Sequence, residues 1–444
     1  SYSVTGVQTC ALPIYGSLNV SNTKNVELYL PDNDRYYYVS SPVSNAKASV
    51  FGNLNLESML YARDVEGSAW TRITNANQDL EVMKGYALKA IDAPKTYLFS
   101  GSLNNSIYSY DLISDGDAWN LIGNPYTSSI DWGSENNAVN GWANDGIRNT
   151  VYIKHGGNFA IWNAAGNGAG VNGGSRYIPS MQSFWVKAEE PGATLSLNNQ
   201  VCVTNSNILM KDLESDNQRL RLIVSRDGLQ DELLVQFDEN ASNSYDRFDA
   251  EKMASVDVNY PQIYCSIEDR NCAISTFSKF ANLFIVPVVF KTNVAGDFKL
   301  RFSDIEGFGN SFALMLEDKL VNKLIDIKKD IVYDFSSEIT ETVDRFVFHF
   351  YNTESTDNLN DGSALGLNDC LSNMIKLYTY KSSVYIESNI MLSANIIIYN
   401  SLGVMSDSFS INGKYVKRTL PLSGTYIIKM IHKNGTITKR INIQ

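Results

Sequence analysis

The stretch Phe298-Lys299-Leu300-Arg301-Phe302 alternates apolar and charged side chains residue by residue. Successive side chains of a β-strand point to opposite faces, so this pattern predicts a strand with one face in a core and one in water. The pattern recurs elsewhere in the chain, on the faces formed by Phe346, Phe348 and Phe350, and by Ile437, Ile441 and Ile443. We therefore expect an all-β fold of tandem antiparallel β-sandwich domains, jelly-roll or Ig-like, with a small Ig-like sandwich at the C-terminus.

Turn dipeptides separate the predicted strands. Asp227-Gly228, Asn412-Gly413 and Asn434-Gly435 have the composition of two-residue hairpin turns, because both positions tolerate positive φ. In residues 371–444 we expect about six or seven short strands, joined at Gly403 and at the last two dipeptides.

Composition limits the possible functions. The 444 residues carry 37 Lys and Arg against 48 Asp and Glu, a net charge of −11, which suits neither nucleic acid nor an anionic membrane as partner. Three His and five Cys leave little material for metal or nucleophilic chemistry. The longest apolar run, residues 283–290, contains Pro287 and is far shorter than the roughly 20 residues of a membrane span, so we expect no transmembrane segment.

Charge and composition divide the chain. Residues 15–200 form an aromatic- and Asn-rich β domain with net charge −5, and residues 201–352 an acidic β-sandwich domain. A polar stretch rich in Asn, Asp, Ser, Thr and Gly, residues 353–370, is typical of a linker. Residues 371–444 then carry net charge +7, and this change of sign predicts a separate basic domain.

The first 14 residues are a probable artefact. Residues 4–14 match an in-frame translation of a common sequencing adapter, which is of the same kind as a cloning scar. We therefore expect that the true N-terminus, with any signal peptide, is missing, and that Cys10 is not a native cysteine.

The search for catalytic residues gives no constellation. His155, His349 and His432 lie in three separate segments, and His349 has the pattern of a structural strand histidine. Gly168, Gly170 and Gly173 match GxGxxG, but no helix follows them, so we interpret the segment as a flexible loop. We expect no catalytic residue, no bound cofactor and no enzymatic activity.

Two acidic loops and one aromatic segment leave alternatives open. The loops that contain Asp32 and Asp34, and Asp115 and Asp117, could supply oxygen ligands to Ca²⁺, but Asx turns have the same sequence. Exposed aromatic side chains could stack on surface glycans, although a β core is the favoured interpretation. The aromatic residues concerned are Trp119, Tyr126, Trp132, Trp142 and Trp162.

Two upstream segments resemble known modules. Residues 36–188 contain Tyr36-Tyr37-Tyr38-Val39-Ser40-Ser41-Pro42-Val43, Trp119-Asn120-Leu121-Ile122-Gly123-Asn124-Pro125-Tyr126 and Gln182-Ser183-Phe184-Trp185-Val186 in order. This order resembles a module of large secreted surface proteins of Bacteroidetes. Residues 219–351, with Asp231-Glu232-Leu233-Leu234-Val235 and Arg345-Phe346-Val347-Phe348, resemble the module that follows it there.

The C-terminal residues give a more specific resemblance. Asn395-Ile396-Ile397-Ile398-Tyr399-Asn400-Ser401-Leu402-Gly403, Ser423-Gly424-Thr425-Tyr426-Ile427 and Thr438-Lys439-Arg440-Ile441 are similar to the type A C-terminal sorting domain of the type IX (Por) secretion system. The Tyr-Pro-Asn-Pro turn that often opens that family is missing. The resemblance implies export through the periplasm to the outer cell surface or medium, with the type IX machinery as partner and Gly403, Gly424, Tyr426 and Lys439 as motif residues. A generic small β-sandwich without an export role is the alternative.

Two functions follow from these resemblances. In the first, the chain is the non-catalytic C-terminal part of a secreted, cell-surface-attached protein with structural or adhesin-like β modules, whose candidate partners are surface glycans or other cell-surface components. In the second, it is the accessory and sorting tail of a truncated extracellular polysaccharide-degrading enzyme or carbohydrate-binding protein.

Export also bears on two cysteines. Cys265 and Cys272 flank a short predicted turn, residues 268–271, that could bring them opposite each other on paired strands. Disulfides persist in exported proteins, so we expect a hairpin disulfide between them, unless a one-residue slip in register turns the side chains to opposite faces.

Overall fold

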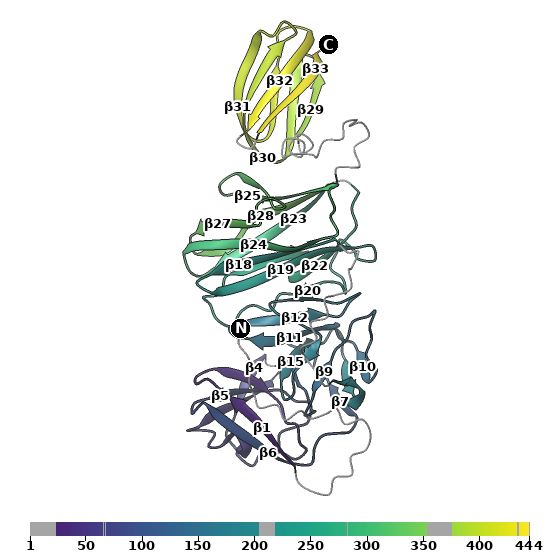
Figure 1. Ribbon diagram of the computed structural model, residues 1–444, viewed down its shortest axis with the longest axis vertical. Helices are drawn as coiled ribbons and strands as arrows, with labels where there is room; N and C mark the ends of the chain where they lie inside the picture. The colour runs from purple at the N-terminus through teal and green to yellow at the C-terminus, as the bar shows by residue number, and fades with distance from the viewer. Residues whose placement is uncertain are drawn as a thin grey trace.

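The computed structural model describes residues 24–203 apart from residues 65 and 67, residues 218–352 apart from residue 282, and residues 375–443 apart from residues 433 and 434. Figure 1 shows these three parts stacked along the long axis of the molecule. We call them the N-terminal unit, the middle sandwich and the C-terminal sandwich. Cys10, Cys370, the predicted linker and the turn residue Asn434 lie outside the described residues.

Nearly all regular structure is β, which confirms the predicted all-β fold class. Two short 3-10 helices, η1 (Ala48–Phe51) and η2 (Asn199–Val201), are the exceptions within the described residues. None of the helices described has the length and apolarity that crossing a membrane requires.

The N-terminal unit contains five small antiparallel sheets, which enclose two apolar clusters. The strand orders are β1-β6, β2-β5-β3-β4, β13-β12-β11-β15-β8, β10-β16-β7 and β14-β9-β17. The strands are β1 (Lys24–Leu30), β2 (Tyr36–Val39), β3 (Ser58–Asp64), β4 (Ala69–Ile73), β5 (Tyr86–Ala90), β6 (Lys95–Gly101), β7 (Tyr108–Asp111), β8 (Trp119–Gly123), β9 (Ser129–Asp131), β10 (Trp142–Asp145), β11 (Thr150–His155), β12 (Asn158–Asn163), β13 (Ala169–Val171), β14 (Tyr177–Ile178), β15 (Ser183–Lys187), β16 (Thr194–Leu197) and β17 (Cys202–Val203).

The middle sandwich is one continuous path of strands folded into two layers, β26-β25-β28-β23-β21-β22-β19-β18-β24-β27, with β20 beside β22. The pair β19–β22 is parallel, and the other pairs are antiparallel. The strands are β18 (Gln218–Arg226), β19 (Leu229–Asp238), β20 (Ala250–Glu251), β21 (Gln262–Ile267), β22 (Arg270–Ser278), β23 (Leu283–Thr292), β24 (Gly296–Glu306), β25 (Phe312–Asp318), β26 (Lys323–Asp326), β27 (Val332–Ser337) and β28 (Thr340–Asn352).

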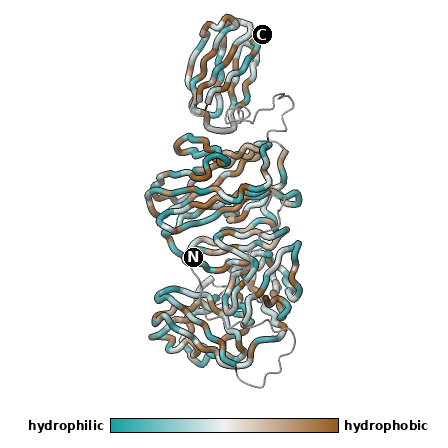
Figure 2. The backbone as a smooth tube through the Cα atoms, viewed as in Figure 1, coloured by the Kyte–Doolittle hydropathy of each residue, from teal (hydrophilic) through white to brown (hydrophobic). Residues whose placement is uncertain are grey.

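The alternating stretches lie in strands as predicted. Phe298, Leu300 and Phe302 of β24 are buried, whereas Lys299 and Arg301 are exposed. The three phenylalanines of β28 face the same core from the opposite layer, and Figure 2 shows the resulting alternation of apolar and polar positions along the strands. The predicted Asp227-Gly228 hairpin joins β18 to β19, with φ of 50° at Asp227 and 82° at Gly228.

The C-terminal sandwich has five strands, not the six or seven that the sequence predicted: β29 (Ile375–Tyr380), β30 (Ser383–Asn400), β31 (Met405–Thr419), β32 (Gly424–His432) and β33 (Gly435–Ile443). The first part of β30 pairs with β29, and its second part pairs with β32. The strand β31 pairs with both parts of β30. These two long strands therefore belong to both layers. Ile437, Ile441 and Ile443 of β33 are buried in the core between the layers, as predicted.

The prediction of a hairpin turn at Asn412-Gly413 was wrong. Both residues lie inside β31, opposite Ser393 and Leu392 of β30. The pairing register shifts just beyond them, between Glu387 and Leu392, where the two strands pass from one layer to the other. A glycine at such an irregularity permits the bend, so the turn-forming residues here serve a crossing between layers.

A shared apolar cluster joins the N-terminal unit to the middle sandwich. Phe159 and Ile161 of β12 and Trp185 of β15 pack with Leu234 of β19 and Ile274 of β22. All five side chains are buried. The two units therefore share a core as well as a surface.

A buried carboxylate lies at the same interface. Asp231 has no exposed surface and forms an ion pair with Lys252, whose side chain is 3% exposed. Asn158 and Asn172 of the N-terminal unit each donate a side-chain hydrogen bond to Asp231, at 2.9 and 3.0 Å, and the amide of Ile263 donates a third at 2.8 Å. Because a buried charge is stable only when it is well satisfied, these contacts tie the two units together in one geometry.

Candidate functional site

Two of the sorting-motif residues are glycines that set backbone geometry. Gly403 has φ of 79° in the turn between β30 and β31, where its amide donates to the Asn400 carbonyl at 3.0 Å. The Asn400 side chain accepts from the amides of Leu402 and Val404, which closes the turn. Gly424 opens β32 with φ of 148°, a conformation that L side chains rarely adopt.

The other two motif residues lie on the inner face of the last hairpin. Tyr426 is 4% exposed, and its hydroxyl donates to the Leu422 carbonyl at 2.8 Å. Lys439 pairs with Ile428 in the β32–β33 register and shares its face with Ile437 and Ile441. Burial lowers the pKa of Lys439 below its usual value. The structure thus brings Gly424, Tyr426 and Lys439 together in one hairpin, whereas Gly403 lies in another turn.

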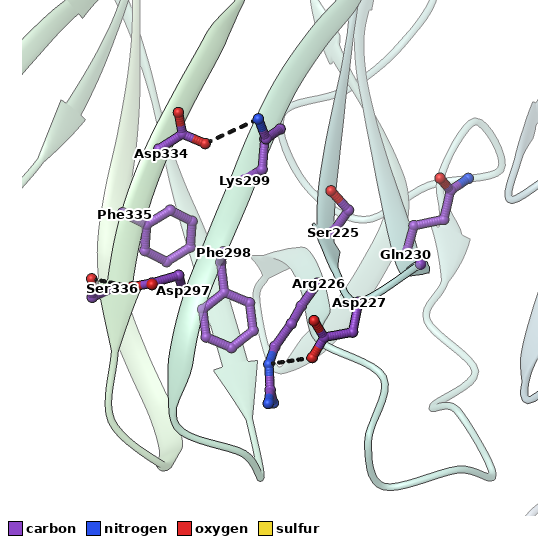
Figure 3. Close-up of a pocket in the computed structure, with 11 residues that line it drawn as sticks. Ser225, Arg226, Asp227, Gln230, Asp297, Phe298, Lys299, Asp334, Phe335 and Ser336 are labelled. Atoms are coloured by element: carbon purple, nitrogen blue, oxygen red, sulfur yellow. Dashed lines mark hydrogen bonds and ion pairs between the residues drawn. The ribbon is translucent and has the colours of Figure 1, made fainter.

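A groove lies at one end of the middle sandwich. It has a volume of about 690 Å³ and is formed by the β18–β19 turn and the neighbouring ends of β24 and β27. Figure 3 shows two ion pairs within it, Arg226 with Asp227 at 3.2 Å and Lys299 with Asp334 at 3.3 Å, whereas Asp297 accepts a hydrogen bond from the Ser336 hydroxyl at 2.6 Å. Phe298 forms part of its wall, with Arg226 at 5.7 Å from its ring centre. Its lining contains three carboxylates, Asp227, Asp297 and Asp334, and no His or Cys.

The GxGxxG segment is explained by close packing. A side chain at Gly168 would collide with the ring of Trp162, and one at Gly174 would meet the backbone carbonyl of Ile161. The loop therefore lies directly on β12, beside a small hollow of about 170 Å³ whose rim includes His155 and Tyr177. Gly168 and Gly174 permit this approach, whereas Gly173 has open space around it. Among the described residues, the next element is the strand β14, so no helix directly follows the loop.

His349 is a buried strand residue, as its pattern indicated. It is 1% exposed, and its Nε2 lies 3.0 Å from a carboxylate oxygen of Glu317. His155 is exposed at the end of β11, and His432 ends β32. Within the described ranges, no three His, Cys, Asp or Glu side chains gather as metal ligands would.

Three of the four weak calcium candidates are in ion pairs. Asp32 pairs with Arg35 at 2.9 Å, Asp34 with Lys89 at 3.0 Å, and Asp117 with Arg63. The fourth, Asp115, accepts the Ala118 amide through its backbone carbonyl at 3.2 Å. Three of the side chains that the sequence grouped as possible ligands are therefore directed to cations of the protein itself.

The aromatic segment is largely part of the core. Tyr126 and Trp132 are buried, and Trp142 and Trp162 pack against the same cluster. The indole N–H groups of Trp132, Trp142 and Trp162 donate to backbone carbonyls at 3.1, 2.7 and 3.0 Å. Trp119 instead packs edge-on against Tyr152, with ring centres 4.8 Å apart.

The predicted disulfide is not present, although the predicted register is. Cys265 and Cys272 lie directly opposite each other on β21 and β22, and both are free thiols. They are 1% and 0% exposed in the core of the middle sandwich. Burial raises the pKa of Cys265 to about 12 and raises that of Cys272 as well. Because thiol oxidation proceeds through the thiolate, this burial disfavours the oxidation of both thiols in the folded state.

Comparison with known proteins places the chain in a family. A family model described as a domain of unknown function, DUF8693, matches residues 7–350, which is most of the chain. No curated protein matches the sequence.

Two solved structures are weakly similar. One is PorZ, described as an essential bacterial surface component of the type-IX secretion system of Porphyromonas gingivalis, at 13% identity and a TM-score of 0.16. The alignment covers 99% of this chain and 47% of PorZ, so the chain spans about half the length of that protein. The other is the BSP domain of a biofilm associated protein, at 9% identity, 95% and 81% coverage and a TM-score of 0.16. TM-scores this low do not indicate a shared fold.

Proposed function

The chain belongs to the DUF8693 family of domains of unknown function, and we propose that it is non-catalytic architecture of a secreted, cell-surface-attached protein. In this proposal, the N-terminal unit and the middle sandwich form a rigid stalk or adhesive element. The C-terminal sandwich is the address that the type IX secretion machinery reads during export to the cell surface.

One observation carries the export proposal. The residues that resemble the type A sorting motif are the ones that hold the C-terminal sandwich in shape, at the Gly403 turn and along the β32–β33 hairpin. This sandwich is also distinct in charge, at +7 in a chain of −11. An address read as a folded shape requires such residues to be intact.

The non-catalytic part of the proposal has separate support. In the groove at the β18–β19 turn, Arg226 pairs with Asp227 and Lys299 with Asp334, and the acidic loops pair with Arg and Lys. We expect no hydrolysis of common glycan or peptide substrates and no tight zinc binding by the purified protein. Either activity would refute this part.

The test of export is a reporter fusion. Residues 371–444 are joined to a fluorescent protein with a signal peptide, in a host that has the type IX system. We expect the intact fusion at the surface or in the medium, and a fusion that lacks residues 436–443 in the periplasm. Tyr426→Ser, at a buried motif position, should also be retained, whereas Tyr415→Ser, at a residue 56% exposed, should be exported. Equal localisation of all four fusions would refute the assignment.

A further inference from the structure

The outer face of one layer of the C-terminal sandwich is rich in tyrosine and lysine. On β29 and β30, strand alternation directs Ile375, Val384 and Ile386 into the core. The residues that alternate with them along each strand therefore lie on the outer face. The first part of β30 pairs with β29 on one side and with β31 on the other. We call the exposed surface across these three strands the tyrosine–lysine face. Its members are Lys376, Tyr378, Tyr380, Tyr385, Tyr415 and Lys417.

Rings and cations alternate along this face. The rings of Tyr378 and Tyr385 are parallel within 5°, with centres 5.0 Å apart, and Tyr415 continues the row 6.5 Å beyond Tyr385. Lys376 Nζ lies 5.6 Å from the centre of the Tyr378 ring, and Lys417 Nζ lies 5.5 Å from that of Tyr385. The cations are therefore held beside the rings by cation–π contacts.

Two tyrosines of the face, one of them outside this row, are largely open to solvent. Tyr380 is 62% exposed and Tyr415 is 56% exposed. An aromatic side chain left in water forgoes the free energy of burial, and a group of such side chains on one surface is characteristic of an interaction site.

The chemistry of the face specifies the class of ligand. Tyrosine rings present apolar surface and a hydroxyl, which suits a sugar ring with its C–H faces and hydroxyl groups. Lysine ammonium groups form charge-assisted hydrogen bonds to carboxylates and sulfates. The sandwich carries net charge +7, so an anionic ligand is attracted to this part of the chain in particular. Glu387 also lies on this face and accepts the Tyr378 hydroxyl at 2.6 Å, so its carboxylate is engaged within the protein.

The geometry points to a binding site for an acidic polysaccharide on the tyrosine–lysine face. Sugar rings pack on Tyr380 and Tyr415, and the carboxylate groups of neighbouring sugars bind Lys376 and Lys417. This activity is separate from export, because it uses the outer surface of β29 and β31, whereas the motif residues Tyr426 and Lys439 lie on the inner face of the last hairpin.

Titration calorimetry of the full chain tests the site, with polygalacturonate oligomers as the acidic probe and dextran as the neutral one. We expect polygalacturonate to bind, more weakly at high salt, and dextran not to bind measurably. Tyr380→Ala combined with Tyr415→Ala, and Lys376→Gln combined with Lys417→Gln, should each weaken binding at least about fivefold. Because these side chains are exposed, both variants should keep the unfolding temperature of the parent.

A charge-matched variant is the control. Lys429→Gln combined with Arg440→Gln removes two positive charges from the other layer and should leave the affinity unchanged. Equal weakening by this variant would show nonspecific attraction and refute the site. Failure of polygalacturonate to bind, or tighter binding of oligothymidylate, would refute it as well. None of these measurements depends on export, so the result stands apart from the reporter fusion.

Discussion

Asp249 shows how a single buried acid sets a pH dependence. It has no exposed surface, and its carboxylate accepts the amides of Thr276 and Asp246 at 2.8 and 2.9 Å. Burial outweighs these hydrogen bonds and raises the pKa of Asp249 to about 7. The unfolded chain has the ordinary, lower pKa, so the folded state holds this proton more tightly. The middle sandwich must therefore lose stability as pH rises from about 4 to about 7.

We predict that Asp249→Asn removes this loss. The unfolding free energy of the parent should fall relative to that of the variant across this pH interval, by at most about 1.4 kcal/mol per pH unit, and the difference should be constant above about pH 8. Urea unfolding at a series of pH values measures it. A difference that does not change with pH would contradict the raised pKa of Asp249.

Arg345 and Asp318 form a buried ion pair in which each charge depends on the other for its stability. The Arg345 guanidinium donates from two nitrogens to Asp318, with contacts of 2.8 to 3.2 Å, and the Tyr333 hydroxyl donates to the same carboxylate at 2.9 Å. Their side chains are 3% and 0% exposed. Arg345→Met should destabilise the protein by about 3–5 kcal/mol, because it leaves a buried carboxylate without its cation.

Two further variants test that interpretation. Arg345→Met combined with Asp318→Asn should be less destabilised than Arg345→Met alone. Lys299→Gln, which breaks an exposed pair with Asp334, should change stability by less than about 0.5 kcal/mol. Denaturant unfolding measures all three, and equal losses in the single and double variants would rule out an uncompensated charge as the cause.

At the scale of the element, the glycine-rich loop can lie directly on β12 only where its residues have no side chain. A Cβ at Gly174 would lie 1.8 Å from the Ile161 carbonyl oxygen, whereas one at Gly173, where φ is 79°, would meet nothing within 4 Å. Gly174→Ala should therefore destabilise the protein by about 3 kcal/mol or more. Gly173→Ala should cost about 1–2 kcal/mol, from backbone strain alone. Urea unfolding compares the two, and a larger loss at Gly173 would disprove the close approach.

Strand periodicity predicted individual elements well, and turn chemistry predicted their connections less well. The alternation at Phe298 and at Ile437 identified β24, β33 and their buried faces, because one-sided burial repeats every second residue. Asn412-Gly413 has the composition of a hairpin, yet it lies within a strand, because what decides its conformation is the passage of β30 and β31 between layers. That passage depends on pairing partners remote in sequence, which a dipeptide does not report.

Several polar contacts also join residues that are remote in sequence, although Asp32 and Arg35 are only three positions apart. Asn158 and Asn172 have the appearance of turn residues in the sequence, but they bind Asp231, 73 and 59 positions away. Asp32, Asp34 and Asp117 have the appearance of metal ligands, and their Arg or Lys partners come from sequence positions that the motif does not include. The sequence therefore identified polar residues that form contacts, but it did not identify the residues that they contact.

At the scale of the whole molecule, the shared core predicts two cooperative units. Phe159 packs with residues of both the N-terminal unit and the middle sandwich, so residues 24–352 should unfold together. The core of the C-terminal sandwich includes only Met315 and Leu324 among the described, buried residues of the middle sandwich, so it should unfold separately. Scanning calorimetry of the full chain should resolve two transitions.

Matched core variants assign these transitions. Phe159→Ala should lower the midpoint of one transition, and Ile428→Ala, in the core of the C-terminal sandwich, should lower the midpoint of the other. Three transitions in the parent protein would show that the N-terminal unit and the middle sandwich fold independently.

The C-terminal sandwich is entered and left at opposite ends. The chain enters at Ile375, runs along β29, and at Thr379 donates a hydrogen bond to the carbonyl of Asn442, next to the last residue of β33. A mechanical pull between Ile375 at the start of β29 and Ile443 at the end of β33 is directed along the strands. Its direction is perpendicular to the hydrogen bonds of the β29–β30 and β32–β33 pairs. The bonds of each strand pair are then sheared together instead of peeling apart one after another, so this small domain is built to withstand tension along its length.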